Sequence, residues 1–318
     1  MANTTRWIFV EKKNSKPNEK DSNISIEDMG AKIEDVKNNP AVLADKQNTI
    51  SKIQVNTEFS KFKKETFGSN KINFNFYKIS YFRTSNIDNT STEDNFWIIL
   101  YTLNQKKYLI INKNSGALTL LRKIFGFKGK NEITQVSHGI DSRMIIWLIS
   151  MVYNKIADYS NSDKTLSIDS INGFKGNTED LLNTISADGS GIMNILSTLS
   201  FLLESSSLKQ IRLTLSFGEH KNLELKIDVN NTIESNEDKY RGIFLTDENS
   251  TADSVVYNQY LLIYNEIIPL IRQWFNESQD DEGDNSTEEE WWKKFYKKFL
   301  LQVSDDLKNK VDEKREEL

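Results

Sequence analysis

The residues best suited to catalysis are Glu224 and Lys226, which stand two positions apart in a segment that alternates polar and apolar side chains. A carboxylate can bind Mg²⁺ while a lysine assists the attacking water, which is the chemistry of metal-dependent nucleases. The preceding strand, expected at 210–217, offers no carboxylate as a second metal ligand. We nevertheless keep a nuclease that uses Glu224 and Lys226 as an alternative function. The simpler interpretation places both on the solvent face of an amphipathic strand.

Other catalytic chemistry depends on residue types that this chain has in small numbers or not at all. There is no cysteine, which excludes a thiol nucleophile, a disulfide, an iron–sulfur cluster and a cysteine-based zinc site. The two histidines, His138 and His220, are too few for a histidine-rich metal site, and no Gly-x-Ser-x-Gly segment is present. We therefore predict no catalytic residue, no metal and no cofactor, and we favour a binding protein over an enzyme.

Electric charge divides the chain into two unlike halves. Residues 1–156 contain 24 Lys and Arg against 15 Asp and Glu, a net charge of +9. Residues 157–318 contain 17 against 31, a net charge of −14, so the whole chain carries −5. Because nucleic acids are polyanions, contact with them is expected in the first half, while the second half would repel them.

The basic excess concentrates between Phe59 and Lys130, where 13 basic residues stand against four acidic ones and aromatic residues are interleaved throughout. Basic side chains bind phosphates with release of counterions, and aromatic rings stack on unpaired bases. This mixture is typical of a surface that binds DNA or RNA. The residues that we predict to contact nucleic acid are Lys61, Lys63, Lys64, Lys71, Lys78, Arg83, Lys106, Lys107, Arg122, Lys123, Lys128 and Lys130.

The same composition also has a purely structural interpretation. The aromatic residues would fill the core of a β-sheet domain while the lysines solvate its outer face. The positive half would then attract the negative half of the same chain or of a second copy. A structural subunit that self-associates without binding nucleic acid is thus a second alternative.

The spacing of apolar residues predicts an α+β protein with two domains, each with a largely antiparallel sheet and packed helices, and a long amphipathic C-terminal helix. The expected divisions are an N-terminal strand and helix extension at 1–47, a basic aromatic-rich domain at 48–156, an acidic domain at 165–277 and the final helix at 286–318. The polar segment Tyr159–Lys164 coincides with the change of charge, which is why the domain junction is expected there.

Helical spacing indicates five helices besides the short one of the extension and the final one. They are expected at 117–125, 139–154, 179–185, 192–203 and 255–275. The last of these contains Pro269, which removes one backbone hydrogen bond and should kink the helix.

An apolar stripe runs along the C-terminal helix, which a capping box at Ser286–Glu289 is expected to begin. The body of the protein or a partner must cover a stripe of that length. We therefore expect contact with a protein partner, or self-association, through this helix. The partner-binding residues that we predict are Trp292, Phe295, Phe299 and Val303.

No apolar segment reaches the roughly 20 residues of a membrane-spanning helix, and the N-terminus has no signal-peptide core. We therefore expect no membrane contact and a cytoplasmic location. The abundance of Asn, Lys and Ile is typical of AT-rich bacterial genomes. The leading hypothesis is a non-enzymatic bacterial component that binds nucleic acid or assembles with other proteins, in a multi-protein system such as phage defence.

Overall fold

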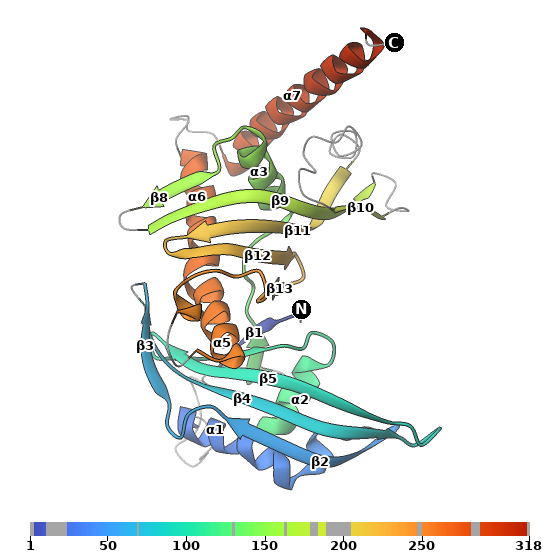
Figure 1. The fold of residues 1–318 in the computed structure, drawn as a ribbon, viewed down its shortest axis with the longest axis vertical. Helices are drawn as coiled ribbons and strands as arrows, with labels where there is room; N and C mark the ends of the chain where they lie inside the picture. Colours follow the sequence, from blue (N-terminus) through green and yellow to red (C-terminus); the bar gives the residue numbers. More distant parts are fainter. Residues whose placement is uncertain are drawn as a thin grey trace. The chain divides into compact units, whose positions relative to one another are not determined.

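The computed structural model describes residues 3–10, 24–68, 70–128, 131–161, 164–178, 184–188, 205–246, 250–280 and 287–316. They divide into two compact units, an N-terminal unit formed by Ala2–Ser137 and a C-terminal unit formed by His138–Leu318. Each unit contains one antiparallel sheet with helices, and the C-terminal unit ends in a 29-residue helix (Figure 1). The predicted α+β class is confirmed. The helix expected at 192–203 lies outside the described residues.

The described strands of the N-terminal unit form a seven-stranded antiparallel sheet in the order β2-β4-β5-β6-β1-β7, with β3 paired to β4 beside β2. The first strand of the chain is thus an internal strand of this sheet, between β6 and β7. The strands are β1 (Thr5–Phe9), β2 (Asn48–Thr57), β3 (Lys63–Phe67), β4 (Asn70–Ser85), β5 (Ser91–Leu103), β6 (Lys106–Ile111) and β7 (Ile133–Gln135).

Helices α1 (Ile26–Glu34) and α2 (Ala117–Phe125) lie against one face of this sheet (Figure 1). The short 3₁₀ helices η1 (Asp35–Asn38) and η2 (Pro40–Val42) lead from α1 to β2. Ser25 caps α1 as the sequence indicates, because its hydroxyl accepts a 3.0 Å hydrogen bond from the backbone N–H of Asp28. The core between helices and sheet includes Ile33, Ile79, Phe96 and Leu121, each completely buried.

The described strands of the C-terminal unit form a second antiparallel sheet in the order β10-β9-β11-β12-β13, with β8 paired to β9. Glycine allows the tight turn between β11 and β12, where Gly218 has φ +54°. The strands are β8 (Asp158–Asn161), β9 (Lys164–Thr178), β10 (Thr184–Asp188), β11 (Ser205–Phe217), β12 (His220–Asp228) and β13 (Thr232–Ser235). Residues 184–185, expected to end a helix, begin β10.

Helix α3 (Ser142–Tyr153) is the buried helix expected near 139–154, and it packs on β11 and β9 of the C-terminal sheet. The helix expected at 255–275 is present as α5 (Ala252–Leu262), a π-helical turn η5 (Ile263–Ile267) and α6 (Ile268–Asp280). The π turn immediately precedes Pro269, where the normal helical hydrogen bond is missing. A 3₁₀ helix, η4 (Ile243–Leu245), precedes α5.

The final helix, α7 (Glu288–Glu316), begins with a capping box one residue later than predicted. The Thr287 hydroxyl accepts a hydrogen bond from the Glu290 backbone N–H at 3.4 Å. In return the Thr287 backbone N–H donates to the Glu290 carboxylate at 2.9 Å. Glu289 and Lys293, four residues apart on α7, form an ion pair with 3.6 Å between their charged atoms. Of the described helices, none is long and apolar enough to cross a membrane.

Candidate nucleic-acid interface

Alternation along β4 decides which side chains share a face of the N-terminal sheet. Tyr77, Ile79 and Tyr81 belong to the core beneath α1 and α2, so they define the helix-covered face. The residues between them, Lys78 and Ser80, point to the opposite face. The register extends this division to the neighbouring strands, because directly paired residues lie on the same face.

Three of the predicted lysines lie together on the helix-covered face, near the end where β4 begins. Lys64 of β3 pairs with Asn73 of β4, and Lys71 lies two positions before Asn73 on the same face. Asn73 pairs with Thr102 of β5, which pairs with Lys107 of β6. Neighbouring strands are about 4.8 Å apart, so Lys64 and Lys107 are roughly 14 Å apart across the sheet. We call Lys64, Lys71, Asn73, Thr102 and Lys107 the lysine row, and none of its members is acidic.

The lysine row continues toward α2 through aromatic contacts. The paired residues of β1 and β6 end at Ile8 and Tyr108, and Phe9 and Lys107 are the next residues of the two strands. The Phe9 ring contacts Phe125 of α2 at 5.0 Å and Phe127 at 6.2 Å between ring centroids. These contacts bring the segment that contains the exposed Lys128 to the same side of the sheet.

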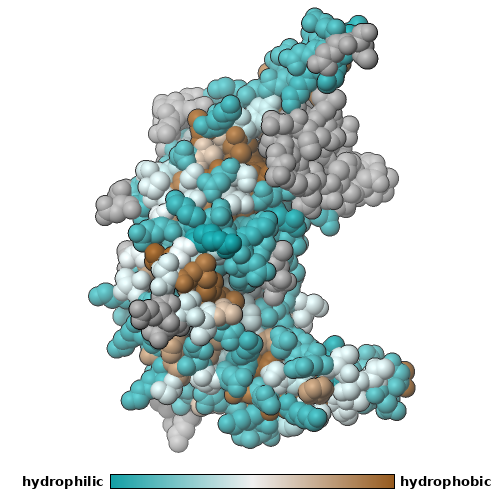
Figure 2. Space-filling view, viewed as in Figure 1, coloured by the Kyte–Doolittle hydropathy of each residue, from teal (hydrophilic) through white to brown (hydrophobic). Residues whose placement is uncertain are grey.

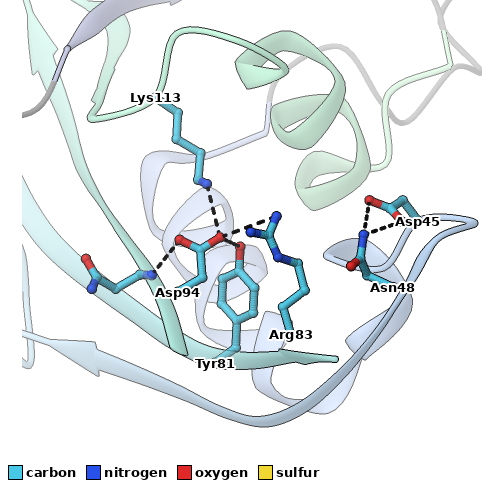
Figure 3. A network of polar contacts seen from close by, with 7 residues as sticks. Asp45, Asn48, Tyr81, Arg83, Asp94 and Lys113 are labelled. Atoms are coloured by element: carbon cyan, nitrogen blue, oxygen red, sulfur yellow. Dashed lines mark hydrogen bonds and ion pairs between the residues drawn. The ribbon is translucent and has the colours of Figure 1, made fainter. Parts of the chain in front are cut away.

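Arg83 lies on the helix-covered face at the other end of β4, in a cluster centred on Asp94 (Figure 3). The Asp94 carboxylate accepts a 2.8 Å hydrogen bond from the Tyr81 hydroxyl and lies 4.0 Å from the Arg83 guanidinium. Lys113 approaches the same carboxylate at 3.9 Å. Burial, followed by the hydrogen bond to Asp94, raises the pKa of Tyr81, so its hydroxyl remains a donor. Arg83 therefore shares one carboxylate with a second cation.

The remaining predicted residues are spread over the unit. Lys63, Lys78 and Lys106 point to the opposite face, and Lys63 lies 2.9 Å from the Glu65 carboxylate. Lys123 of α2 donates to the Ala44 carbonyl at 2.8 Å. The other three lie in different places: Lys61 in the loop before β3, Arg122 on α2, and Lys130 outside the described residues. The twelve residues thus do not form one surface, although Lys64, Lys71 and Lys107 come together.

Most aromatic residues of the basic segment are core residues, which prevents them from stacking on bases. Phe74, Phe76, Tyr77, Phe96 and Tyr101 are each at most 2% exposed. Phe82 and Trp97 are only partly buried, and both lie on the opposite face of the sheet. The visible surface of the N-terminal unit is largely hydrophilic with scattered apolar residues (Figure 2). Exposed aromatic surface is therefore limited to a few positions.

One of these partly exposed rings, Phe82, lies beside Lys52, which is not among the lysines predicted from the sequence to contact nucleic acid. The register of β2 against β4 shifts between Ser51 and Gln54, and Lys52 within this bulge has φ +50°. The bulge places the Lys52 ammonium 5.1 Å from the centre of the Phe82 ring. A prediction that assumes strict alternation assigns residues after a bulge to the wrong face of the sheet, because one extra residue reverses the face on which the following side chains lie.

The catalytic pair considered above lies on β12, and each residue faces an opposite charge. The Lys239 ammonium lies 2.5 Å from the Glu224 carboxylate, and the Lys226 ammonium lies 3.2 Å from Glu234 of β13. Only 7% of the Glu224 side chain is exposed, so the solvent-facing position expected for it is wrong. Within the described ranges, no group of three or more histidine and acidic side chains is arranged to hold a metal ion. The arrangement is that of two adjacent ion pairs.

Both histidines are buried. His138 accepts a 3.0 Å hydrogen bond from the Ile140 N–H, and its other ring nitrogen lies 2.8 Å from the Asp228 carbonyl. The second contact joins the segment before α3 to the end of β12. His220 lies 2.7 Å from the Tyr240 hydroxyl and is 7% exposed. Burial lowers the pKa of His220 to about 4 and also lowers that of His138.

The predicted partner-binding residues of α7 have two different environments. Phe299 and Val303 are 3% and 0% exposed, and the Phe299 ring lies 5.9 Å from Tyr153 of α3. Trp292 and Phe295 are only partly buried. A second set of side chains lines a shallow pocket on the same helix: Trp292, Lys293, Tyr296, Lys297, Leu300, Leu301 and Ser304. The buried half of the stripe therefore holds α7 to its own unit.

No protein-family model matches this chain, and no curated protein matches it either.

Proposed function

We propose that this chain is a non-enzymatic nucleic-acid-binding component, and that its N-terminal unit contacts the polyanion. The observation that carries the proposal is the lysine row, in which side chains from four adjacent strands lie on one face. Lys64 and Lys71 stand at one end and Lys107 at the other. The amide of Asn73 and the hydroxyl of Thr102 lie between them and supply neutral donors to phosphate oxygens.

Charge distribution along the chain supports the same assignment. Residues 1–137 contain 22 Lys and Arg against 14 Asp and Glu, a net charge of +8, whereas residues 138–318 contain 19 against 32, a net charge of −13. A polyanion would be attracted to the N-terminal unit and repelled by much of the C-terminal unit, which favours binding to the first alone. Such a component fits a bacterial multi-protein assembly in the cytoplasm, which is part of this proposal.

Binding is tested with fluorescently labelled DNA and RNA, single-stranded and duplex, by anisotropy over a range of salt concentrations. The variant Lys64→Gln/Lys71→Gln/Lys107→Gln removes the three charges of the row. Each lost phosphate contact lowers the slope of log K against log salt by about 0.7–0.9, so the slope should fall by roughly 2–3. The matched control is Lys294→Gln/Lys298→Gln/Lys308→Gln, which makes the same change in net charge at exposed positions of α7 that do not line its pocket.

Absence of binding to every probe at low salt would refute the proposal. Equal losses in the two triple variants would show that net charge alone, rather than the row, drives binding. Both variants should keep the wild-type melting temperature within a few degrees, because lysines that are exposed or, like Lys107, only partly buried contribute little to stability.

A second candidate function is self-association in an assembly, and the pocket on α7 supports it. The lining places Lys293 and Lys297 beside Trp292, Tyr296 and two leucines. The acidic surface of a second copy would complement these lysines. Light scattering should then show an oligomer that dissociates as salt rises and is weakened by Leu301→Lys. A monomer at all salt concentrations would rule this candidate out.

A further inference from the structure

The opposite face of the N-terminal sheet carries a second set of residues suited to nucleic acid, at the end where β4 meets β5 at the hairpin. On β4 this face presents Lys78, Ser80 and Phe82. Their partners on β5 are Trp97, Asn95 and Glu93, in that order. On β2, Asn56 and Gln54 pair with the first two. Adding Lys52 from the bulge, we call Lys52, Gln54, Lys78, Ser80, Phe82, Asn95 and Trp97 the aromatic patch.

The two aromatic rings of the patch differ from the other rings on the same face in exposure. Phe74 and Phe76 are 0% and 2% exposed, whereas Phe82 and Trp97 are only partly buried. The Trp97 ring contacts Phe76 at 5.9 Å between centroids, with 39° between the ring planes. The Trp97 backbone N–H also donates to the Asn112 side chain at 2.6 Å. The indole is therefore held by the core on one side while part of it remains accessible.

Each accessible ring has a cation beside it. The Lys52 ammonium lies 5.1 Å from the centre of the Phe82 ring. Lys78 is directly opposite Trp97 in the ladder and is exposed. Aromatic rings next to cations are the combination that binds single strands, because the rings stack on bases while the cations neutralise the phosphates that join them.

The spacing and the polar residues of the patch favour unpaired bases over a duplex. Phe82 and Trp97 are separated by four residues along the strand and one strand across, which is about 14 Å. That distance allows each ring to stack on a different base. Between them lie Gln54, Ser80 and Asn95, whose amides and hydroxyl can donate to and accept from base edges. Base faces and pairing edges are accessible in single strands and hidden in a duplex.

We propose that the aromatic patch binds single-stranded nucleic acid by stacking bases on Phe82 and Trp97 while Lys52 and Lys78 contact the phosphates. This inference rests on the proposed function, since it names the class of nucleic acid and the side chains that read it. Stacking is tolerant of sequence because every base has a π face. Binding should therefore depend on strandedness more than on base composition.

The test uses labelled oligothymidine and oligouridine of about 20 nucleotides, together with a duplex of the same length, in anisotropy titrations at low salt. Wild-type protein should bind the single strands more tightly than the duplex. Phe82→Ala should weaken single-strand binding by at least about 5-fold, whereas Phe82→Tyr should retain it, because tyrosine also stacks. Lys52→Gln should lower the salt slope for single strands by about 0.7.

The matched control is Phe59→Ala. Phe59 is also a partly buried phenylalanine with a lysine above it, since the Lys63 ammonium lies 5.6 Å from its ring centre, but it lies outside the patch. This variant should bind single strands like the wild type. Trp97→Phe provides a second readout, because the quenching of tryptophan fluorescence on binding should decrease even if affinity is retained.

The possible outcomes separate this inference from the function on which it rests. If duplex and single strands bind equally and Phe82→Ala changes nothing, the patch is refuted while nucleic-acid binding by the unit stands. Loss of binding only in the triple variant of the lysine row likewise refutes the patch and leaves the proposed function in place. If no probe binds, both proposals fail. Equal losses in Phe82→Ala and Phe59→Ala would attribute the effect to stability and also refute the patch.

Discussion

The cations of the two units have partners that differ in exposure. In the N-terminal unit the paired carboxylates are partly exposed, 32% for Glu65 beside Lys63 and 27% for Asp94 beside Arg83 and Lys113, and Lys52 lies 5.1 Å from the centre of the Phe82 ring. In the C-terminal unit three paired carboxylates are nearly buried: Glu266 beside Lys164 is 1% exposed, Glu224 beside Lys239 is 7% exposed, and Glu234 beside Lys226 is 11% exposed.

This difference separates charge that maintains the fold from charge that remains available to a partner. A lysine paired with a buried carboxylate is needed to neutralise it, because an uncompensated buried charge is strongly destabilising. A lysine over a partly buried ring or beside a partly exposed carboxylate stays in contact with solvent and contributes only about 0.5–1 kcal/mol. The comparison therefore predicts that the C-terminal cations govern stability and the N-terminal cations govern binding.

The largest effect on stability is expected from removal of the Lys164 ammonium. The Glu266 side chain is 1% exposed and lies in the π-helical turn, so its charge depends on a partner inside the protein. Lys164→Met should lower the free energy of unfolding by about 3 kcal/mol, measured by urea denaturation. Lys113→Met is the control, since its partner Asp94 is 27% exposed and the loss should stay below about 1 kcal/mol. Equal losses would contradict the assignment of structural charge to the C-terminal unit.

Mild acid provides the second test, because both histidines lie in the C-terminal unit. Burial lowers the pKa of His220 to about 4, whereas an unfolded histidine has a pKa of about 6.5. Below pH of about 6.5 the unfolded chain takes up a proton that the folded unit does not. Stability is therefore complete above that pH and falls as the pH drops toward 4.

Between pH values of about 7 and 5 the C-terminal unit should lose about 2 kcal/mol, while the N-terminal unit changes little. Hydrogen exchange followed by mass spectrometry can measure the two units separately. His220→Gln should reduce the loss, because the glutamine does not titrate. An equal loss in both units would show that carboxylates rather than histidines determine the response.

Two single substitutions, Lys226→Gln and Lys52→Gln, should have smaller effects, the first on stability and the second on binding. Lys226→Gln removes the cation beside Glu234, whose side chain is 11% exposed, and should destabilise the protein by about 1–2 kcal/mol. Lys52→Gln should change stability by no more than about 1 kcal/mol yet weaken binding of single-stranded DNA. Thermal melts and anisotropy titrations of the two variants should therefore rank them in opposite orders.

Much of the fold could be predicted from local patterns. Period-two alternation indicates most strands, since a strand that is half buried must alternate. The capping box of the final helix follows from local chemistry, with an error of one residue in its position. Apolar spacing identifies the helix at Ser142–Tyr153 but does not predict which sheet the helix covers. The apolar face of a helix can pack against any apolar surface.

The candidate surfaces were less predictable, because register and bulges decide them. Lys64, Lys71 and Lys107 come together only through pairing among four strands, and those pairings are not local in sequence. Lys52 reaches Phe82 only because the register shifts within β2. Glu224 is buried although it occupies a polar position in an alternating strand, because Lys239, 15 residues later in the chain, neutralises it.

The smallest effect on stability is expected at the hairpin turns of the two sheets. Both turns contain left-handed backbone positions, but different residue types occupy them. The β11–β12 turn has Gly218 at φ +54°, whereas the β5–β6 turn has Asn104 and Gln105 at φ +50° and +64°. A left-handed backbone is strained for residues other than glycine, and Asn-Gly is the preferred pair for such a turn. Gln105→Gly should therefore stabilise the protein by about 0.5–1 kcal/mol in urea denaturation, and Gly218→Ala should destabilise it by a similar amount. Open space around Gly218 means that a methyl group meets no atom within 4 Å, so any loss there reports backbone strain alone.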